Sequence, residues 1–595
     1  MIEKIKVNIL LSIFLLNLFL LTGCSFIKNI IDVTNESTNI QESDETSKII
    51  YTNESEVISV IDKELWYEEA DDYSIETMYL TVSEGNSGDN TNHTWQEVNN
   101  YSIFYYDELG IERYAVEGLL QVGDKNGPVK GELGYDSIVP NARVNVRGNT
   151  TSAATQKSYK IELDKGKGLW REQRTIILNK HIWDPTRIRN KLSYDLMRDI
   201  PGMISSRSQF VHLYVKDLTS SNMTRGKFID YGLYTQVEQF NNRFLRNHGF
   251  DDGGHLYKAE MFEFFRYKDD LKLKTDQDYD LKKFEKVVEI KGNDDHGKLL
   301  EMLDDINNPS IPITESFPKY FDEENYFTWM AFHILIGNRD TTNRNFYLYS
   351  PLNSKKWYFI SWDNDGGWNV DRSNQDLKSN GHEIGISNYW GVVLHQRVLK
   401  NNLYREKLDE KIIELKNYLT PSMLKERIDK YANLITPYSY REPDIDHMRL
   451  PIGQFKKYIN DLPSTVELNY KLYEESINRP MPFFIGVPTN TTSGKIRFNW
   501  DIAYDLDNEK ITYDVTISDS YLFDNIIYES KSGLLPVVET DLKLKNGNYF
   551  VRVIAKNQSG FLQTSFDYYV DENSVKHYGV LPFVVENGDI DLLHQ

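Results

Sequence analysis

Hydrophobic and polar positions along the chain predict two β-rich parts separated by a helical part. From about residue 75 the apolar residues follow the two-residue period of a strand in short runs, including 78–82 and 101–105. Glycine and asparagine turns divide these runs. The same period predicts strands at 142–147, 158–163, 210–216 and 231–238, and a helical period at 187–198 interrupts them. The predicted order is two strands, a helix and two more strands.

The middle of the chain changes to helical periodicity. Asp322 is placed to cap a strongly apolar helix over 323–336, which ends before a polar loop. From 390 to about 477 the pattern is mostly that of amphipathic helices. Together with the strands before it, this segment predicts an α+β domain over 75–480, with a β-rich N-lobe and a helical C-lobe.

After a proline-containing stretch the strand period returns and predicts a small all-β sandwich over 484–575. The strands are expected at 495–500, 511–517 and 548–553. Trp500, Tyr513 and the turn before the last of these strands are similar to positions of fibronectin type III modules. Residues 576–595 would then form a C-terminal tail.

The first 24 residues have the pattern of a bacterial lipoprotein signal. Two lysines precede a nearly uninterrupted apolar run over 7–20, and Leu-Thr-Gly-Cys follows and ends at Cys24. A transmembrane anchor is the alternative, but the run is short for a bilayer span. The ending is similar to the lipobox, in which the cysteine carries the lipid. We therefore expect a lipid-anchored, extracytoplasmic protein of the bacterial cell envelope, with residues 25–74 as a disordered polar tether.

Composition narrows the functional classes. The 595 residues include 68 Lys and Arg against 89 Asp and Glu, and the formal net charge of −21 repels nucleic-acid phosphates unless one face is basic. Nucleic acid is therefore not an expected partner. The single cysteine excludes internal disulfides and cysteine-based zinc clusters. The chain also lacks a Gly-Lys-Ser/Thr phosphate loop, a Gly-x-Ser-x-Gly elbow and a His-Glu-x-x-His motif.

Two acidic motifs carry the candidate chemistry. Asp340 stands five residues before Asn345, as the catalytic base and the metal-binding asparagine do in protein kinases. Asp363 follows a hydrophobic strand where a metal ligand is needed, and Asp365 is a further candidate ligand. Hard oxygen ligands of this kind suit Mg²⁺ or Mn²⁺. The alternative is a loop of capping Asp and Asn residues, but the order of the motifs around an aromatic strand favours a metal site.

A series of short motifs resembles the spore coat protein H (CotH) kinase family over roughly residues 75–477. No single motif is specific, and their shared order and spacing carry the resemblance. The motifs are Val146-Arg147-Gly148-Asn149-Thr150, Lys157-Ser158-Tyr159-Lys160-Ile161, Arg189-Asn190-Lys191-Leu192, Gly232-Leu233-Tyr234, Val237-Glu238-Gln239, Leu256-Tyr257-Lys258, Gly337-Asn338-Arg339-Asp340 and Trp362-Asp363. The resemblance implies an atypical protein-kinase-like fold that uses ATP and a divalent metal to phosphorylate protein hydroxyls.

The resemblance also implies roles for individual residues. Asp340 would orient the acceptor hydroxyl and accept its proton, while Asn345 and Asp363, with Asp365 as a further candidate, would hold Mg²⁺ or Mn²⁺. Arg147, Gly148 and Asn149 would form the turn that approaches the phosphates, and an ordinary glycine turn is the alternative.

Lys157 begins the next predicted strand and would reach the α and β phosphates. Lys160 has the opposite parity on that strand, so only one of the two can face the nucleotide, and the family pattern favours Lys157. Asp195, on the helix that follows, is the candidate acidic partner of this lysine. Glu238 and Lys258 are candidate contacts to nucleotide or substrate, and a strand-end carboxylate and a surface lysine are the alternatives.

The predicted function is transfer of the γ-phosphoryl group of ATP to Ser or Thr hydroxyls of envelope or surface proteins. Asn338 stands where many kinases carry histidine, and Asp363 is followed by Asn-Asp-Gly, so activation-loop regulation is not carried over. A lipid-anchored domain outside the cytoplasm meets little ATP, which leaves the phosphodonor open. The alternatives are a non-catalytic surface-binding protein and an AMP-transferring enzyme of the same fold.

Overall fold

The computed structural model describes residues 60–67, 71–221, 226–370 and 382–593, together with the short strands β1 (Tyr51–Thr52) and β2 (Glu56–Val57). The chain forms two compact units. Of the described residues, one unit comprises those up to 482 together with 504–509, and the other comprises 483–503 and 510–593. Cys24 and the expected signal peptide lie outside the described residues. Within the described ranges, no helix has the length and apolar character needed to cross a membrane.

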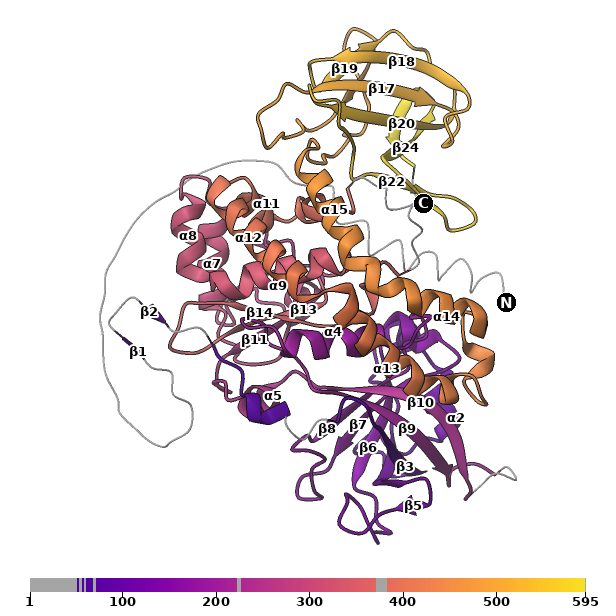
Figure 1. The fold of residues 1–595 in the computed structure, drawn as a ribbon. Coiled ribbons are helices and arrows are strands. Elements are labelled where there is room, and N and C mark those ends of the chain that lie inside the picture. The colour runs from indigo at the N-terminus through magenta and orange to yellow at the C-terminus, as the bar shows by residue number, and fades with distance from the viewer. Residues whose placement is uncertain are drawn as a thin grey trace. The chain divides into compact units, whose positions relative to one another are not determined.

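The larger unit contains an eight-stranded sheet in the order β3-β9-β10-β8-β7-β6-β4-β5, and β3 also pairs with β4 (Figure 1). This extra pairing closes seven of the strands into a ring. Alternate residues of these strands point into one apolar core, which includes Leu80, Val144, Ile161 and Leu213. The strands are β3 (Ile75–Ser83), β4 (Val116–Asp124), β5 (Gly127–Pro128), β6 (Ala142–Arg147), β7 (Ser158–Leu163), β8 (Thr175–Asn179), β9 (Ser208–Asp217) and β10 (Phe228–Glu238).

The expectations for this sheet are confirmed except at 101–105. Helix α2 (Trp95–Asn100) and helix α3 (Ile103–Leu109) occupy that region. Helix α3 ends where Gly110 adopts φ 63°, and the Gly110 N–H donates to helix carbonyls. The alternating aromatic residues of this run pack their rings against one another, as Tyr101 and Tyr105 do at 4.0 Å between centroids. Tertiary packing and the glycine stop therefore override the strand period.

Helix α4 (Arg189–Arg198) contacts both β9 and the 3-10 turn η3 (Asn364–Gly366), which follows the second sheet of this unit. That sheet has the order β12-β11-β13-β14. Its strands are β11 (His255–Ala259), β12 (Val288–Ile290), β13 (Phe346–Ser350) and β14 (Tyr358–Ser361). The helix between the predicted strands is thus confirmed, and it lies buried between two parts of the unit.

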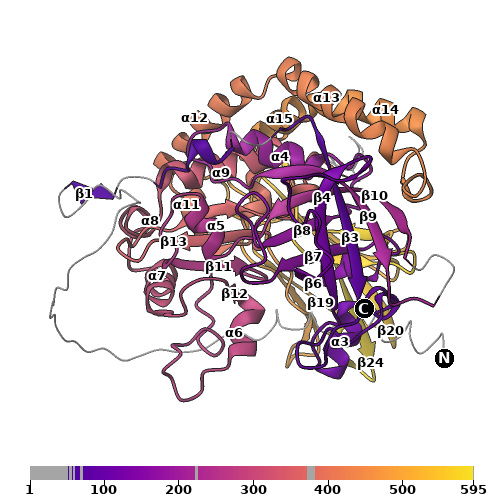
Figure 2. The same ribbon diagram turned by 90° about the horizontal axis from the view of Figure 1, so that it is seen from below.

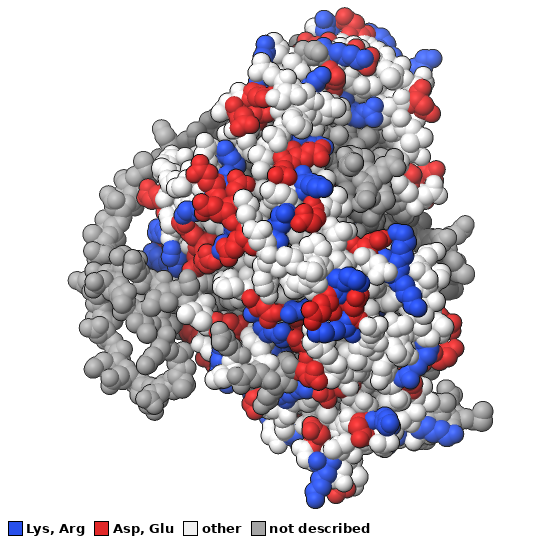
Figure 3. All heavy atoms as spheres, in the orientation of Figure 1, with Lys and Arg blue, Asp and Glu red and all other residues white. Residues whose placement is uncertain are grey.

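Most of the helices follow in the second half of this unit. Asp322 caps α9 (Glu323–Leu335) by accepting a hydrogen bond from the Asn325 N–H over 2.9 Å, as the sequence predicted. The other helices are α5 (Asn242–Asn247), α6 (Leu281–Val287), α7 (Gly297–Asn307), α8 (Ile313–Tyr320), α11 (Val393–Leu399), α12 (Asn402–Tyr418), α13 (Pro421–Ser439), α14 (Ile452–Asp461) and α15 (Thr465–Ile477). On the face drawn in Figure 3, acidic side chains gather over the region of α11 and α12. The mixed α+β class is confirmed.

The end of the expected tether is packed against the larger unit. Within residues 60–67, Trp66 Nε1 donates to Glu238 Oε1 over 3.0 Å, and Asp62 Oδ1 lies 2.7 Å from His248 Nδ1. Against the effect of burial, the carboxylates of Asp62 and Glu238 raise the pKa of His248 to about 9. The expectation of a disordered tether up to residue 74 is therefore wrong for these residues, because aromatic and charged side chains anchor them.

The smaller unit is a β-sandwich with one shared core. A three-stranded sheet, β15-β16-β19, and a six-stranded sheet, β18-β17-β20-β24-β25 with β21 on β20, contribute apolar residues such as Phe498, Val553 and Phe583 to it. The expected tail is wrong for its described residues, because β24 (Val580–Glu586) pairs along β20 (Gly547–Lys556) and supplies part of this core. The remaining strands are β15 (Thr489–Asn490), β16 (Ile496–Asn499), β17 (Thr512–Ser518), β18 (Ile526–Gly533), β19 (Val537–Thr540), β21 (Leu562–Thr564), β22 (Tyr568–Val570), β23 (Lys576–Tyr578) and β25 (Asp589–Leu592).

Asp444, in the connection between α13 and α14, joins the helices to the eight-stranded sheet. Helix α13 contacts β10, and Figure 2 shows both elements. Asp444 Oδ2 accepts a hydrogen bond from the Leu233 N–H of β10 over 2.7 Å, and Asp444 Oδ1 lies 2.7 Å from Lys180 Nζ. Gln156 Nε2 also donates to Oδ1 over 2.8 Å. Gly232 leaves room for this carboxylate, because a Cβ at its φ of 77° would overlap Asp444.

Substitution Gly232→Ala should therefore destabilise the protein by about 3 kcal/mol, because backbone strain is added to a clash with a buried carboxylate. Gly110→Ala is the matched control, since Gly110 also has positive φ but no atom lies within 4 Å of its Cβ position. We expect the control to cost about 1 kcal/mol. Urea unfolding measures both, and equal losses would show that the Asp444 contact contributes nothing.

Candidate metal and phosphate site

Asp340 lies in the loop between α9 and β13, where hydrogen bonds within the loop hold its backbone and its carboxylate. The Asp340 N–H donates to Asn338 Oδ1 over 3.2 Å, and Asn345 Nδ2 donates to Asp340 Oδ2 over 2.9 Å. Gly366 approaches from the turn after β14, and a Cβ there would lie 3.2 Å from the Asp340 Cβ. The structure thus brings the Asp340 loop and the Asp363 turn together.

His333 of α9 contacts both the Asp340 loop and the end of β14, which precedes Asp363. Its Nδ1 lies 3.3 Å from Asn338 Nδ2, and its Nε2 lies 2.8 Å from Ser361 Oγ at the end of β14. Because an amide nitrogen donates, Nδ1 accepts and the Nε2–H donates to Ser361. Burial lowers the pKa of His333 to about 3, so the ring is neutral near neutral pH. Sequence reasoning missed this residue, since it reads as one more position of a buried helix.

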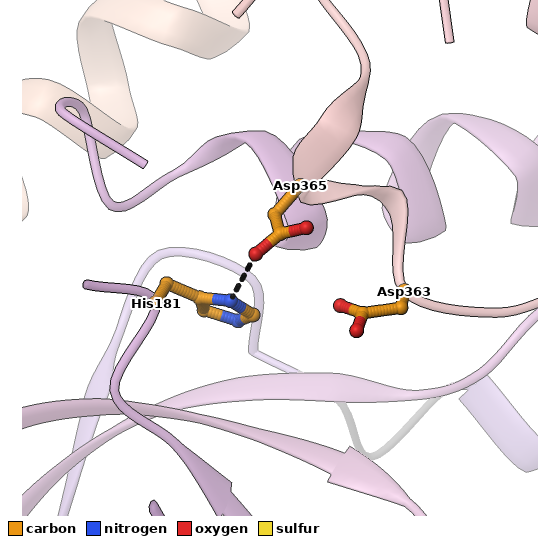
Figure 4. A group of neighbouring side chains, drawn as sticks. All are labelled: His181, Asp363 and Asp365. Carbon is orange, nitrogen blue, oxygen red and sulfur yellow. Dashed lines mark ion pairs between the residues drawn. The ribbon is translucent and has the colours of Figure 1, made fainter. Parts of the chain in front are cut away.

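His181, Asp363 and Asp365 converge on one point (Figure 4). One ligand atom from each of the three residues lies within 4.8 Å of the others, and His181 Nδ1 is 3.6 Å from Asp365 Oδ2. Asp363 has φ 49°, a left-handed conformation that turns the chain sharply at the end of β14. The turn brings the carboxylates of Asp363 and Asp365 close together, and their assignment as ligands of one cation stays a prediction.

The electrostatics of the turn favour a bound cation. Burial raises the pKa of Asp363 to about 7, and the charge of Asp365 acts in the same direction, while Arg147 opposes it. Incomplete hydration raises the pKa of Asp340 as well, although 52% of its side chain is exposed. Neighbouring carboxylates repel one another, and a divalent cation between them would relieve this repulsion. Carboxylate oxygens are the ligands that Mg²⁺ and Mn²⁺ prefer, so the residues fit such a cation.

Arg147, at the end of β6, faces this turn from the eight-stranded sheet. Its guanidinium donates to Asn179 Oδ1 and lies 5.7 Å from the centroid of the Trp362 ring. Burial lowers the pKa of Arg147, and the nearby Asp363 carboxylate opposes that effect. A planar guanidinium beside a carboxylate-held cation is suited to binding phosphate oxygens. The structure therefore brings Arg147 to the site.

The turn after β6 is narrow because of Gly148. Gly148 has φ 91°, and a Cβ there would overlap the Thr151 side chain. Arg113 donates to the carbonyl of Val146 over 3.0 Å and to that of Gly148 over 2.8 Å, and this fixes the turn. Asn149 follows and begins the 3-10 turn η2 (Thr150–Ala153). The backbone conformation at position 148 and the adjacent Thr151 side chain therefore require a glycine, independently of any ligand.

The two candidate lysines have different surroundings. Lys157 Nζ donates to the Ser152 carbonyl over 2.7 Å and so closes the turn after β6. Lys160 Nζ is 3.1 Å from Glu162 Oε2 on the outer face of the sheet, where 37% of its side chain is exposed. Lys157 therefore lies at the turn after β6, whereas Lys160 forms a solvent-exposed ion pair.

The expected partnership of Asp195 with this lysine is wrong. Asp195 Oδ2 lies 2.9 Å from Lys191 Nζ on the same helix, and Ser208 Oγ donates to Asp195 Oδ1 over 2.9 Å. The Tyr431 hydroxyl donates to it as well. Burial raises the pKa of Asp195, and these partners account for its carboxylate.

Glu238 and Lys258 lie among protein partners. Glu238 is buried, and its oxygens accept from Trp66, from the Arg207 N–H over 2.7 Å and from His248. These bonds assign Glu238 to the core of the unit and not to an adenine contact. Lys258, on β11 opposite Tyr347, pairs with Glu260. Its contact with nucleotide or substrate stays a prediction.

Sequence reasoning also missed His181 and the function of Asn190. His181 follows β8, and Asn190 lies on α4, so neither has a spacing that connects it to Asp365. Asn190 Nδ2 lies 3.2 Å from His181 Nε2, and Asn190 Oδ1 accepts from the Asn364 N–H over 2.9 Å. The available sequence signal was that polar residues stand at the end of a strand and at the start of the helix that follows it.

Comparison with known proteins agrees with the family resemblance. The model of the family described as CotH kinase protein matches residues 144–477, which is more than half of the chain and includes Arg147, Asp340 and Asp363. Inner spore coat protein H of Bacillus subtilis (strain 168) is 28% identical over 226 residues. The aligned part is 38% of this chain and 58% of that protein, so the chain spans less than two thirds of this relative.

Asp363→Asn should stabilise the protein in the absence of metal at pH 8. When a carboxylate has a folded-state pKa raised to about 7, its ionisation destabilises the folded protein as the pH rises from the ordinary pKa to that value. Above pH 7 the wild type therefore carries the full cost of ionising Asp363. Because each pKa unit corresponds to about 1.4 kcal/mol, we expect a gain of up to about 4 kcal/mol in the free energy of unfolding.

Thermal unfolding with and without Mn²⁺ checks this prediction. At a hundredfold excess over its dissociation constant, a cation should stabilise the wild type by about 2.7 kcal/mol and leave Asp363→Asn unchanged. Asp269→Asn, in an exposed loop of the same unit, is the control and should respond to Mn²⁺ as the wild type does. An equal response of Asp363→Asn would contradict the assignment of the cation to this turn.

Proposed function

The chain belongs to the CotH kinase protein family, and on this premise we propose that it transfers the γ-phosphoryl group of ATP to Ser or Thr hydroxyls of proteins. The observation that carries the proposal is the convergence of Asp340, Asp363 and Arg147, which come from three separate segments. Phosphoryl transfer requires a positioned hydroxyl, a cation on the phosphates and a further positive charge. These three residues meet those requirements in one place.

The order of elements supports a protein-kinase-like arrangement. The first half of the larger unit has the order of a kinase N-lobe, in which strands flank a glycine loop and a helix. The elements in that order are β6, the Gly148 turn, β7, β8, α4, β9 and β10. Helix α9, the Asp340 loop, β13, β14 and Asp363 likewise follow the order of a catalytic loop and a metal-binding aspartate. We therefore propose two lobes that meet at the Asp340 loop.

Asp340 is the proposed base. Its raised pKa and its partial exposure suit a carboxylate that accepts a proton from an acceptor hydroxyl at the surface. Asn345, which the sequence places as a metal ligand, instead donates its amide hydrogens to the Asp340 carbonyl and carboxylate, so it holds the base in position. Its Oδ1 is the atom left for a cation.

Arg147 and Lys157 are the proposed phosphate contacts. The Arg147 guanidinium is oriented by Asn179 and Trp362, so little of its side-chain freedom remains to be lost on binding. Mg²⁺ or Mn²⁺, held by Asp363 and Asp365, would supply charge neutralisation on the phosphate oxygens when bound. The backbone at Gly148 can approach a phosphate because no side chain stands there.

We further propose that the protein is lipid-anchored at Cys24 outside the cytoplasm and acts on envelope or surface proteins. The apolar run and the lipobox-like ending carry this part of the proposal. A fibronectin type III role for the smaller unit is proposed on its sandwich and on Trp500 and Tyr513. Labelling with a palmitate analogue, lost in Cys24→Ser, tests the anchor.

Asp340→Asn should lower the rate of phosphoryl transfer by about 10²- to 10⁴-fold and leave Mn²⁺ binding intact, because the base is lost and the cation ligands remain. Intact-mass spectrometry of the full chain with ATP, Mg²⁺ or Mn²⁺ and a serine-rich protein measures the transfer. Phosphoryl additions support a kinase, and adenylyl additions would instead show AMP transfer.

Matched lysine variants refine this experiment. Lys157→Ala should raise the KM for nucleotide, whereas Lys160→Ala, on the same strand region but paired with Glu162, should change it by less than about twofold. The absence of any modification, together with the absence of metal-dependent nucleotide binding, would contradict the proposal and favour a surface-binding protein.

A further inference from the structure

Polar contacts around His181 form a chain that begins and ends on the turn carrying Asp363 and Asp365. The Asn364 N–H donates to Asn190 Oδ1 over 2.9 Å. Asn190 Nδ2 lies 3.2 Å from His181 Nε2, and His181 Nδ1 lies 3.6 Å from Asp365 Oδ2. Figure 4 shows the imidazole edge facing Asp365. A helix residue and a strand-end residue thus connect two neighbouring positions of one turn.

The orientation of the Asn190 amide follows from its first bond. A backbone N–H can only donate, so the atom of Asn190 that meets Asn364 must be the oxygen. The amide nitrogen then faces the imidazole, and it can only donate as well. His181 Nε2 must therefore be the acceptor and carry no hydrogen.

A neutral imidazole has one N–H, so the hydrogen of His181 is on Nδ1. That N–H faces Asp365, whose Oδ2 lies 3.6 Å from Nδ1, a separation at which the N–H dipole attracts the carboxylate without a direct hydrogen bond. Nε2 then accepts from Asn190, and Nδ1 carries the hydrogen that faces Asp365. No lone pair is left for a cation.

We infer that His181 positions Asp365 and is not itself a metal ligand, an inference that rests on the cation site of the proposed function. For Nδ1 to bind a cation, the proton would have to move to Nε2 and the Asn190 amide would have to reverse. The Asn364 N–H would then lose its acceptor inside the protein, where an unpaired donor is costly. His181 is 7% exposed, Asn190 is 1% and Asn364 is 0%, so solvent has little access to replace the lost bond.

The neighbouring residues keep His181 in place. Lys180 is held by Asp444, and the Arg187 guanidinium donates to the Lys180 carbonyl. His181 itself has φ 46°, which directs its side chain away from the path of β8. Metal-ligating carboxylates are commonly oriented by such outer hydrogen bonds. Here the outer contact comes from a histidine whose tautomer is set by an asparagine.

The first test reads the tautomer directly and needs neither metal nor nucleotide. In the full chain with ¹⁵N-labelled histidine, NMR distinguishes the two ring nitrogens of each of the 12 histidines. His181→Asn assigns the signals by their loss. The expected result is a hydrogen on Nδ1 and none on Nε2 of His181, and the reverse tautomer would overturn the inference.

The second test uses Mn²⁺ alone as the probe, with binding followed by electron paramagnetic resonance. We expect no directly coordinated imidazole nitrogen in the wild type. His181→Leu should weaken Mn²⁺ binding by about 10- to 100-fold, whereas His181→Asn, which keeps an N–H donor near the Nδ1 position, should stay within about threefold of the wild type. A coordinated nitrogen signal in the wild type, or equal losses in both variants, would overturn the inference.

Asn190→Asp provides a variant with the opposite expectation. A carboxylate can accept from both Asn364 and His181, so the imidazole hydrogen should move to Nε2 and free Nδ1 for the cation. We expect an imidazole nitrogen signal to appear on Mn²⁺ in this variant alone. The tautomer result stands even if phosphoryl transfer fails, whereas a correct tautomer with no Mn²⁺ binding would overturn the cation site and with it the positioning role.

Discussion

The burial of charged side chains on helix α4 is the constraint on which the site depends. Arg189, Lys191 and Asp195 are almost fully buried, and a buried charge is tolerated only when partners replace its hydration. Lys191 is paired with Asp195, and Arg189 Nη1 lies 3.1 Å from Asp184 Oδ1. Each pair has a required geometry, so the helix can occupy few positions relative to its neighbours. A purely apolar helix would pack with more freedom.

The same helix determines where the turn carrying Asp363 and Asp365 lies. Ser193 Oγ accepts from Trp368 Nε1 over 3.0 Å, and Asn190 accepts from the Asn364 N–H. The 3-10 turn η3 is therefore bonded to α4 on both sides of Gly366. This matters because Asp363 and Asp365 repel one another, and a loosely held turn would separate them. Bonds to a rigid helix keep the two carboxylates together at an electrostatic cost.

Sequence reasoning predicted the elements whose information is local. The strands at 142–147 and 158–163 were predicted at their observed bounds, because alternation and flanking turns mark both ends. Asp340 and Asp363 could be predicted because chain order through α9, β13 and β14 brings them together. The failures concern partners. Nothing in the pattern shows that Asp195 bonds Lys191, since several acceptors lie within reach of a buried lysine.

Other failures came from competition between local patterns and tertiary packing. The run at 101–105 alternates as a strand does, but the glycine stop after it and the packed tyrosine rings favour α3. The segment at 580–585 is continuously apolar and contains a proline, and it lies within the expected C-terminal tail. In the structure it borders β20 and buries both Leu581 and Phe583. Strand pairing over long separations has no signature in a single segment.

The positive charge opposite the carboxylates shows how chemistry and packing are combined in this fold. Arg147 ends a strand of the ring, yet it faces Asp363 on a turn from the other part of the same unit. Its contact with Trp362 puts the guanidinium over an aromatic face next to the turn that carries Asp363 and Asp365. Because Asn179 holds the guanidinium, the charge is in position before any ligand arrives. The energetic cost of burying this arginine is therefore met during folding, and a phosphate that binds beside Asp363 meets a cation that is already oriented.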